Sequence, residues 1–294
     1  MAIVDPDLRR TWLFGPGADA NAHAAMQSSG ADALIADLED FTPPDRRESA
    51  RRALPLLLRS WREAGRIVAV RINALETEGP SDLVAAMPSR PDVIAYPMAT
   101  LPEQMHALHS ALTHWEGVVG IPLGLTEILP VCETALGVVN VRVIAAGSAR
   151  IRCALLGAED LSADLCAERH SDALELDYAR RRFLLECRAA GIEPIDAPYT
   201  FSDTEAAIRE ATYSRRLGYR CKSLVRPEHA APLNAVFTPG GDEIRRANAI
   251  VDAFEAARAR GEDRVLVEGL WVEVPTYRNA RRLIERASRL ADRK

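Results

Sequence analysis

Short apolar runs alternate along the chain with longer segments in which apolar residues recur every three or four positions. The longer segments have the period of amphipathic helices. In the segment after Thr42, a stripe of this kind includes Leu54, Leu57, Leu58 and Trp61, and Pro55 within it predicts a kink. The short runs predict eight strands, at Thr11–Gly15, Ala33–Leu38, Ile67–Ile72, Asp92–Pro97, Thr126–Cys132, Ile151–Gly157, Ile192–Asp196 and Cys221–Val225.

Eight strand-then-helix units in succession predict an α/β fold of the (β/α)8 TIM-barrel type, because parallel strands need helical crossovers. We expect this barrel to be a catalytic domain over residues 1–238. An open, doubly wound sheet is the second interpretation of the pattern. It is disfavoured because no G-x-G-x-x-G motif follows any of the predicted strands.

The pattern changes after residue 238. Residues 242–260 predict a helix, residues 264–273 a β-hairpin and residues 275–290 a second helix. Such a short segment makes a poor independent domain. We therefore expect residues 239–294 to form a helix-hairpin-helix appendage that packs on a neighbouring subunit.

Composition and charge exclude several classes of partner. The 294 residues carry a formal net charge of −5, which offers no basic field to a nucleic acid or to an anionic membrane. Neither a signal peptide nor a long apolar span is evident, so a cytoplasmic protein is expected. The five cysteines contain no C-x-x-C pair, and we interpret them as small buried hydrophobes.

Acidic residues follow several predicted strands. In a barrel of this type the carboxyl ends of the strands share one rim, which carries the chemistry. Like charges gathered there favour a bound cation, and oxygen ligands favour Mg²⁺ or Mn²⁺ over zinc. The alternative is that each carboxylate only caps the helix that follows it. The residues expected at this rim are Asp37, Glu39 and Asp40, Arg71, Glu133, Glu159 and Asp160, and Asp196.

Seven segments together resemble the HpcH/HpaI aldolase family, in the branch that contains citrate lyase β subunits, malyl-CoA lyases and citramalyl-CoA lyases. Each segment alone is a weak signal, but their common order and spacing are specific. The segments are Arg10–Gly17 (R-S-x-L-F-x-P-G in the family), Ala36–Asp45 (D-L-E-D-A-V-x-P), Val70–Asn73 (V-R-x-N), Pro130–Gly137 (P-x-I-E-T-A-x-G), Leu156–Leu161 (G-x-x-D-L), Ile195–Asp196 with Leu217–Tyr219, and Gly269–Pro275 (G-x-M-I-D-x-P).

The resemblance implies a Mg²⁺-dependent barrel, often a homotrimer, that cleaves or forms a carbon–carbon bond in an acyl-CoA or 2-oxo acid. Glu133 and Asp160 would be the metal ligands. Arg71 would bind a substrate carboxylate. Asp37 and Asp40 would orient metal-bound water, and Asp40 would thereby contact the substrate. Arg10 would add positive charge for substrate at the first strand.

The C-terminal motif implies a further catalytic acid. The family has an aspartate there, supplied by a neighbouring subunit, and this sequence has Glu273. Two other positions depart from the family pattern. Met98 stands where a lysine is usual, and Arg226 stands where a histidine is usual. We interpret these two changes as signs of an altered substrate.

Three functions remain open on the sequence alone. The first is a Mg²⁺-dependent lyase acting on a citryl-, malyl- or citramalyl-CoA type of substrate. The second is a class II aldolase acting on free 2-oxo acids, which is weakened because such enzymes use a histidine base and no histidine ends a predicted strand. The third is a non-catalytic, ligand-binding paralogue.

Overall fold

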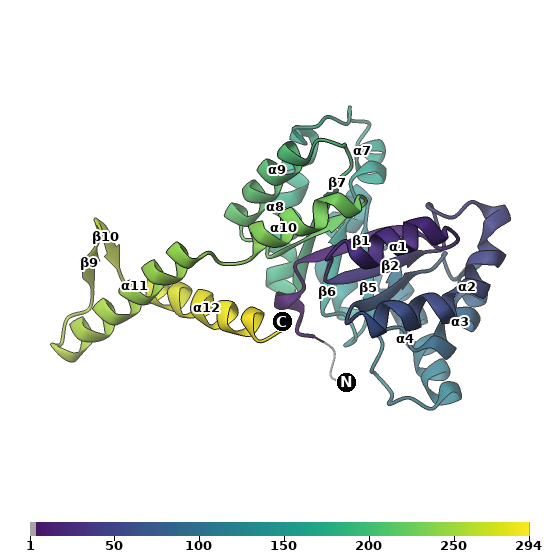
Figure 1. The fold of residues 1–294 in the computed structure, drawn as a ribbon, viewed down its shortest axis with the longest axis horizontal. Coiled ribbons are helices and arrows are strands. Elements are labelled where there is room, and N and C mark those ends of the chain that lie inside the picture. Colours follow the sequence, from purple (N-terminus) through teal and green to yellow (C-terminus); the bar gives the residue numbers. More distant parts are fainter. Residues whose placement is uncertain (1–3, 294) are drawn as a thin grey trace. The chain divides into compact units, whose positions relative to one another are not determined.

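A computed structural model describes residues 4–293 and shows eight parallel strands in a closed barrel, ordered β1 to β8 (Figure 1). All eight predicted strands are confirmed, and the barrel fold with them. The strands are β1 (Thr11–Pro16), β2 (Ala33–Asp37), β3 (Ile67–Arg71), β4 (Val93–Tyr96), β5 (Glu127–Cys132), β6 (Cys153–Leu156), β7 (Glu193–Tyr199) and β8 (Cys221–Leu224).

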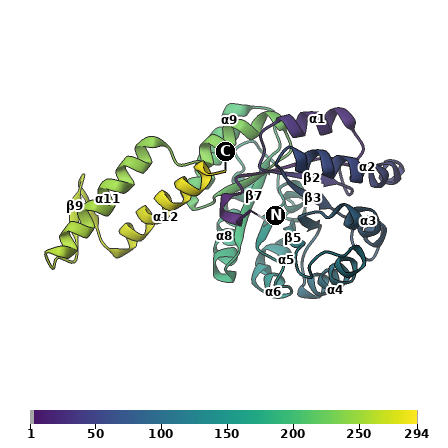
Figure 2. The same cartoon turned by 60° about the horizontal axis from the view of Figure 1, so that its bottom comes forward.

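Helices surround the strands as an outer layer (Figure 2). The stripe that the sequence predicts in α2 is buried, with Leu54, Leu58 and Trp61 fully covered, and α2 continues as one helix through Pro55. No helix within residues 4–293 is both long and apolar enough to cross a lipid bilayer. The helices of this layer are α1 (Ala20–Ser28), α2 (Pro44–Glu63), α3 (Gly79–Ala86), α4 (Pro102–Val119), α5 (Ala135–Val139), α6 (Val141–Ala146), α7 (Glu159–Asp164), α8 (Asp177–Ala190), α9 (Thr204–Leu217) and α10 (Ala230–Phe237).

The inside of the barrel is a packed hydrophobic core. Alternate residues of each strand point inward, as strand geometry requires. At the amino ends of the strands this core is closed by a buried ion pair, in which Arg9 donates to both oxygens of Glu127 at 2.6 and 2.7 Å. The inward positions include Trp12 and Phe14, Ala33 and Ile35, Ile67 and Ala69, Leu129 and Val131, and Cys153 and Leu155.

Asp196 does not lie at the rim, which corrects the sequence-based expectation. Strand β7 continues beyond it to Tyr199, with a register shift between Asp196 and Tyr199. The Asp196 carboxylate is fully buried and accepts bonds from Arg180 of α8 at 2.9 and 2.7 Å, and from Lys222 of β8 at 2.7 Å. Lys222 also donates to the carbonyl oxygen of Ala197. Asp196 therefore belongs to an ion cluster that fixes β7 to its neighbours.

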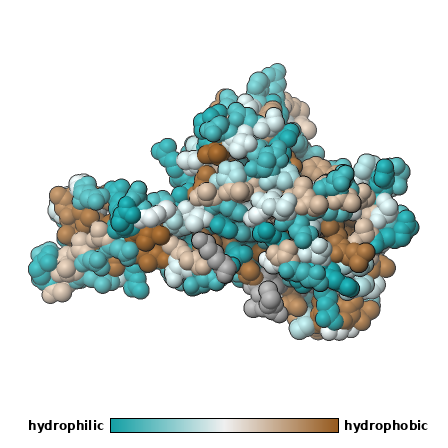
Figure 3. All heavy atoms as spheres, in the orientation of Figure 1, coloured by the Kyte–Doolittle hydropathy of each residue, from teal (hydrophilic) through white to brown (hydrophobic). Residues whose placement is uncertain are grey.

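A second compact unit begins at Val236. It contains α11 (Gly241–Ala259), an antiparallel hairpin of β9 (Val265–Val267) and β10 (Leu270–Val272), and α12 (Val274–Ala291). The predicted helix, hairpin and helix are thus all present. Hydrophobic residues also reach the surface of this unit (Figure 3). Its own small core is built from Ala247, Ile250 and Phe254, with Val272 and Ala280.

Candidate active site

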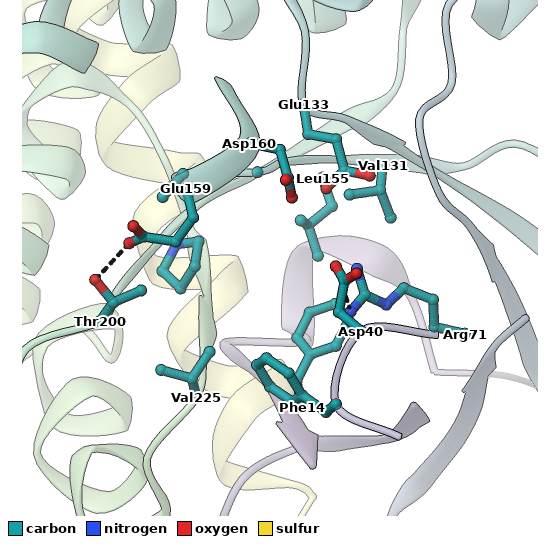
Figure 4. A pocket seen from close by; sticks show the side chains of 14 residues that line it. Phe14, Asp40, Arg71, Val131, Glu133, Leu155, Glu159, Asp160, Thr200 and Val225 are labelled. Carbon is teal, nitrogen blue, oxygen red and sulfur yellow. Dashed lines mark hydrogen bonds and ion pairs between the residues drawn. The ribbon is translucent and has the colours of Figure 1, made fainter. Parts of the chain in front are cut away.

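A cavity of about 280 Å³ lies at the carboxyl ends of the barrel strands (Figure 4). Gly157 and Ala158 supply backbone to its wall. Its polar side chains are Asp40, Arg71, Glu133, Glu159, Asp160 and Thr200. Its apolar side chains are Phe14, Phe41, Val131, Leu155, Pro198 and Val225.

Strand alternation explains why functional side chains face this cavity. Arg71 stands two residues beyond the core residue Ala69, and Glu133 stands two beyond Val131. Residues two apart on a strand share a face. The inward faces of β3 and β5 therefore change from apolar to charged at the rim, where the barrel core ends.

Arg71 is the centre of a buried ion cluster. Its guanidinium pairs with Asp37 through Nε–Oδ1 at 2.8 Å and Nη2–Oδ2 at 2.5 Å, a bidentate geometry. Glu39 lies 3.0 Å from Nη1, and Asp40 lies 3.4 Å from Nη2. Burial alone would lower the pKa of Arg71, but the charge and hydrogen bonds of Asp37 raise it. Arg71 is thus held charged and in one orientation.

Two aromatic rings flank the same guanidinium. The Arg71 Cζ atom lies 5.2 Å from the ring centre of Phe14 and 5.9 Å from that of Phe41. The two rings meet edge to face at 6.4 Å. A cation over an aromatic face is stabilised by the ring quadrupole. The rings therefore restrict the movement of Arg71 on the side that its carboxylate partners leave open.

Glu133 is buried at the end of β5, only 4% exposed. Its Oε1 accepts a bond of 2.8 Å from the backbone N–H of Met98, a residue with the positive φ of 47°. Burial raises the pKa of Glu133 to about 7. The positive charge of Arg71 lowers this pKa, while the like charges of Asp160 and Asp40 raise it further. A carboxylate in this setting is stabilised by an additional positive charge.

Asp160 lies in the first turn of α7, after β6. Burial raises its pKa, and Asp40 adds to the rise, while Arg71 and a hydrogen bond with Glu133 oppose it. Figure 4 shows the carboxylates of Asp160 and Glu133 directed into the same part of the cavity. Two acidic groups so close together repel each other unless a proton or a cation lies between them.

This pair of carboxylates fits a magnesium ion. Mg²⁺ takes oxygen ligands and commonly keeps water in several of its positions, so two protein ligands are enough. Within residues 4–293 no group of three or more His, Cys, Asp or Glu side chains is arranged to hold a metal. Zinc sites are usually built from three or four such ligands. Glu133 and Asp160 are therefore suited to a hydrated hard cation.

Five of the residues predicted at the rim line the cavity: Asp40, Arg71, Glu133, Glu159 and Asp160. Asp37 is not part of the lining. Both of its oxygens are occupied, by Arg71 and by the backbone N–H groups of Glu39 and Phe41. The expectation that Asp37 orients metal-bound water is not supported by these contacts, which instead fix Arg71 and the loop after β2.

Arg10 is separated from the cavity. It precedes β1, and its guanidinium donates to Asp32, the residue before β2, at 2.9 Å from both Nε and Nη2. This pair lies at the amino ends of the strands, on the opposite side of the barrel from the rim. This position does not support the prediction that Arg10 binds substrate, because a residue that precedes a strand lies at the amino end of that strand and not at the rim.

Glu273 belongs to the C-terminal unit, where it is exposed at the N-cap of α12. Its neighbour Val272 is fully buried, so the two side chains face opposite ways as predicted. The two residues that depart from the family pattern both lie outside the cavity lining. Met98 contributes its backbone N–H, and the Arg226 guanidinium lies 3.3 Å from Glu228.

The apolar wall of the cavity is not among the features that the sequence predicts. Phe14 and Val225 could have been found, because they continue the inward alternation of β1 and β8. Pro198 and Thr200 could not, because the register shift in β7 breaks the alternation there. Thr200 donates to Glu159 at 2.7 Å, so it also fixes an acidic side chain of the lining.

Several known proteins are similar to this chain in sequence and in fold. The family model described as HpcH/HpaI aldolase/citrate lyase matches residues 10–227. The chain belongs to the HpcH/HpaI aldolase/citrate lyase family. It is 34% identical over 283 residues to the citrate lyase subunit beta of Leuconostoc mesenteroides subsp. cremoris, covering 96% of this chain and 94% of that one. The predicted family is confirmed, together with the class of carbon–carbon lyases to which its relatives belong.

Two further proteins extend the comparison. The L-malyl-CoA/beta-methylmalyl-CoA lyase of Cereibacter sphaeroides is 30% identical over 308 residues, covering 96% of this chain and 95% of that one. The crystal structure of CitE from Mycobacterium tuberculosis, in complex with magnesium and acetoacetate, aligns with a TM-score of 0.64 at 25% identity. It covers 81% of this chain and 94% of that one.

Proposed function

We propose that this family member is a Mg²⁺-dependent lyase that cleaves a β-hydroxy acyl-CoA into an acyl-CoA and a 2-oxo acid. The observation that carries the proposal is the pairing of Glu133 and Asp160 beside Arg71 in one cavity at the rim. The relatives named citrate lyase subunit beta and malyl-CoA lyase support the reaction class. The magnesium in the related CitE structure supports the choice of metal.

The cleavage is a retro-aldol step. The β-hydroxyl loses its proton, its oxygen becomes the carbonyl of the 2-oxo acid, and the bond between the α and β carbons breaks. The electron pair of that bond passes to the α carbon as a thioester enolate, which then takes up a proton to give the acyl-CoA. A bound Mg²⁺ supplies Lewis-acid polarisation of the hydroxyl and carbonyl oxygens.

The residues of the chain have separate tasks in this scheme. Glu133 and Asp160 hold the metal, and Arg71 binds the carboxylate of the acid fragment, for which its planar fork is suited. We assign Asp37 to positioning Arg71, because it makes the bidentate pair with that guanidinium. Asp40, at the cavity mouth, remains our candidate for contact with substrate or with metal-bound water.

The enolate must take up its proton from an acid. We propose Glu273 for this role, supplied by a neighbouring subunit of a homotrimer or larger homo-oligomer. Two observations support an association through the C-terminal unit. Glu273 is exposed, and the hairpin beside it leaves Leu266, Leu270 and Trp271 with about half of each side chain in solvent. Exposed apolar residues grouped together commonly mark an interaction surface.

A histidine-based aldolase is not favoured by the cavity. Among the described residues that line it there is no histidine. His229 follows β8, but its ring is fully buried, and burial lowers its pKa. A base of the class II aldolase type would have to reach the substrate from elsewhere. The carboxylates and Arg71 fit the acyl-CoA reaction better.

The experiment is a substrate panel assayed for the released carbonyl product in the presence of Mg²⁺. Malyl-CoA, citramalyl-CoA and citryl-CoA represent the proposed reaction, and 4-hydroxy-2-oxo acids represent the aldolase. The expected result is turnover of a CoA ester that is lost in Glu133→Gln and retained in Glu168→Gln, a matched change at an almost fully exposed side chain. Turnover of the free acids alone would contradict the proposal, and turnover of nothing by metal-loaded protein would favour a binding protein.

A further inference from the structure

Apolar side chains form the floor of the cavity and part of its wall, next to its acidic residues. Val131 and Leu155 lie one inward step below the rim and form its floor. Val225, from the end of β8, lies across the cavity from Glu133 (Figure 4). No charged or amide side chain interrupts this wall between Pro198 and Val225 among the described lining residues. The one hydroxyl of this wall among the described lining residues, that of Thr200, donates its hydrogen to Glu159. A substrate fragment that reaches the wall therefore meets carbon atoms and a hydroxyl whose hydrogen is already used.

The charged side is dominated by acids. Among the described lining residues Arg71 is the only cation, against the carboxylates of Asp40, Glu133, Glu159 and Asp160. Arg71 is moreover already paired with Asp37, which lies just behind the lining. Four carboxylates against one guanidinium leave a net negative lining, and one divalent cation does not cancel it completely. The site therefore accommodates few further negative charges.

Neither departure from the family pattern adds a cation to the cavity. Met98 is neutral, and its side chain is half exposed outside the lining. Arg226 is not part of the lining, and its guanidinium lies 3.3 Å from Glu228. The charge balance of the lining is thus set by Arg71 and the acids.

We propose that the acid fragment is a 2-oxo monocarboxylate carrying hydrogen or a small alkyl group, and that dicarboxylates such as oxaloacetate are excluded. This inference rests on the proposed function and narrows its substrate. The single carboxylate lies at Arg71 and the metal, and the alkyl group packs on Leu155 and Val225. The CoA ester cleaved is then of the malyl or alkyl-malyl kind and not of the citryl kind.

The physical reason is the cost of burying a second carboxylate. At the apolar wall it would lose its water, and the Thr200 hydroxyl there already donates its hydrogen to Glu159. A charge that is buried unpaired is strongly disfavoured. Nearer the metal it would be repelled by Glu159 and Asp160. A methyl or ethyl group in the same place gains from leaving water. The two effects act in the same direction, so the preference is expected to be large.

The test is direct binding, measured by calorimetry with the full-length protein in saturating MgCl₂. Pyruvate and 2-oxobutyrate are compared with freshly dissolved oxaloacetate, which differs from 2-oxobutyrate by a carboxylate in place of the terminal methyl group. The monocarboxylates are expected to bind at least about tenfold more tightly. Oxaloacetate binding as tightly as 2-oxobutyrate overturns the inference and leaves the proposed lyase intact. Binding of neither acid by magnesium-loaded protein overturns both.

A charge added to the wall provides the reciprocal test. Val225→Lys supplies the missing cation, so oxaloacetate should gain about tenfold in affinity over 2-oxobutyrate. Val118→Lys places the same charge on an exposed helix position of α4 and should leave the preference unchanged. An unchanged Mg²⁺ affinity in each variant shows that the metal site is still formed. A folded Val225→Lys protein without this gain contradicts the inference, and if the variant does not fold the comparison of acids decides alone.

Discussion

Gly157 lies so close to Glu133 that a side chain between them has no room. A Cβ atom at residue 157 would lie 2.4 Å from the Cβ of Glu133 and 2.9 Å from its Oε2. Gly157 directly follows β6, and Glu133 directly follows β5, so the two strand ends meet at the candidate metal site. The missing side chain of one residue therefore determines where the carboxylate of the other can lie.

Gly157→Ala tests this contact. The added methyl group must displace Glu133, so Mg²⁺ affinity should fall at least about tenfold, with a loss of about 1–3 kcal/mol in unfolding free energy from overpacking. Calorimetry and thermal denaturation measure the two effects. Gly117→Ala is the control, because Gly117 is exposed in helix α4 with open space where its Cβ would lie. Equal Mg²⁺ affinity in the Gly157 variant and in the original protein would contradict the steric account.

Arg71→Lys keeps the positive charge and removes the planar fork. The bidentate pair with Asp37 cannot form, and the substrate carboxylate loses its directional partner. The value of kcat/KM should therefore fall by a factor that corresponds to a loss of about 1.5–3 kcal/mol in transition-state stabilisation. Steady-state kinetics on the preferred CoA ester measure this loss. Arg52→Lys, at an exposed arginine of α2, should retain full activity. Unchanged kinetics in the Arg71 variant would show that Arg71 is structural only.

Asp196 should contribute strongly to stability. Asp196→Asn breaks its pairs with Arg180 and Lys222 and leaves buried charge uncompensated, at a cost of about 3–5 kcal/mol. Urea unfolding at neutral pH measures the loss. Asp252→Asn, on an exposed position of α11, is the matched control and should unfold like the original protein. A loss of less than about 1 kcal/mol in unfolding free energy, the contribution of an exposed ion pair, would show that the buried cluster around Asp196 does not stabilise the fold.

The same residue predicts how stability depends on pH. Burial alone would raise the pKa of Asp196, but Arg180 and Lys222 lower it below its ordinary value. A lowered pKa in the folded state gives stability that is present at neutral pH and is lost as the pH falls below about 4, where the unfolded carboxyl takes up its proton. The difference in stability between the original protein and Asp196→Asn should therefore shrink in acid. A constant difference would mean that Asp196 does not titrate as proposed.

Subunit mixing tests the role of Glu273. If its acid acts in a neighbouring subunit, inactive Glu273→Gln and inactive Glu133→Gln chains should recover some activity when mixed, because some sites then combine an intact barrel with an intact Glu273. Glu133→Gln mixed with Asp160→Asn is the control, since each of these barrels carries a defect. A monomeric protein in solution, or equal activity in both mixtures, would rule out action between subunits.

The sequence predicted the strands and most of the rim because their signals are local. An apolar run with inward alternation identifies a strand, and the residue after it must then lie at the rim, as Glu133 does after β5. Arg10 was expected near the substrate although it precedes β1. The same rule places a residue that precedes a strand at the opposite end of the barrel.

What the sequence could not provide is pairing between distant residues. Asp196 looked like a strand end because nothing near it reveals Lys222, which lies on the next strand and fixes the register shift of β7. The sequence likewise does not show that both Asp37 oxygens accept hydrogen bonds from Arg71 and from backbone N–H groups. A buried charge must be paired, but its partner can lie far away in the sequence. The sequence near the charged residue therefore does not identify the partner.

A calorimetric titration with Mg²⁺ tests whether Glu133 and Asp160 together bind one ion. The original protein and Glu168→Gln should each bind one ion with the same affinity. Glu133→Gln and Asp160→Asn should each lose affinity by at least about tenfold while keeping their fold, judged by circular dichroism, because each removes one of two anionic ligands. Affinity equal to that of the original protein in both variants would contradict the assignment of the metal site.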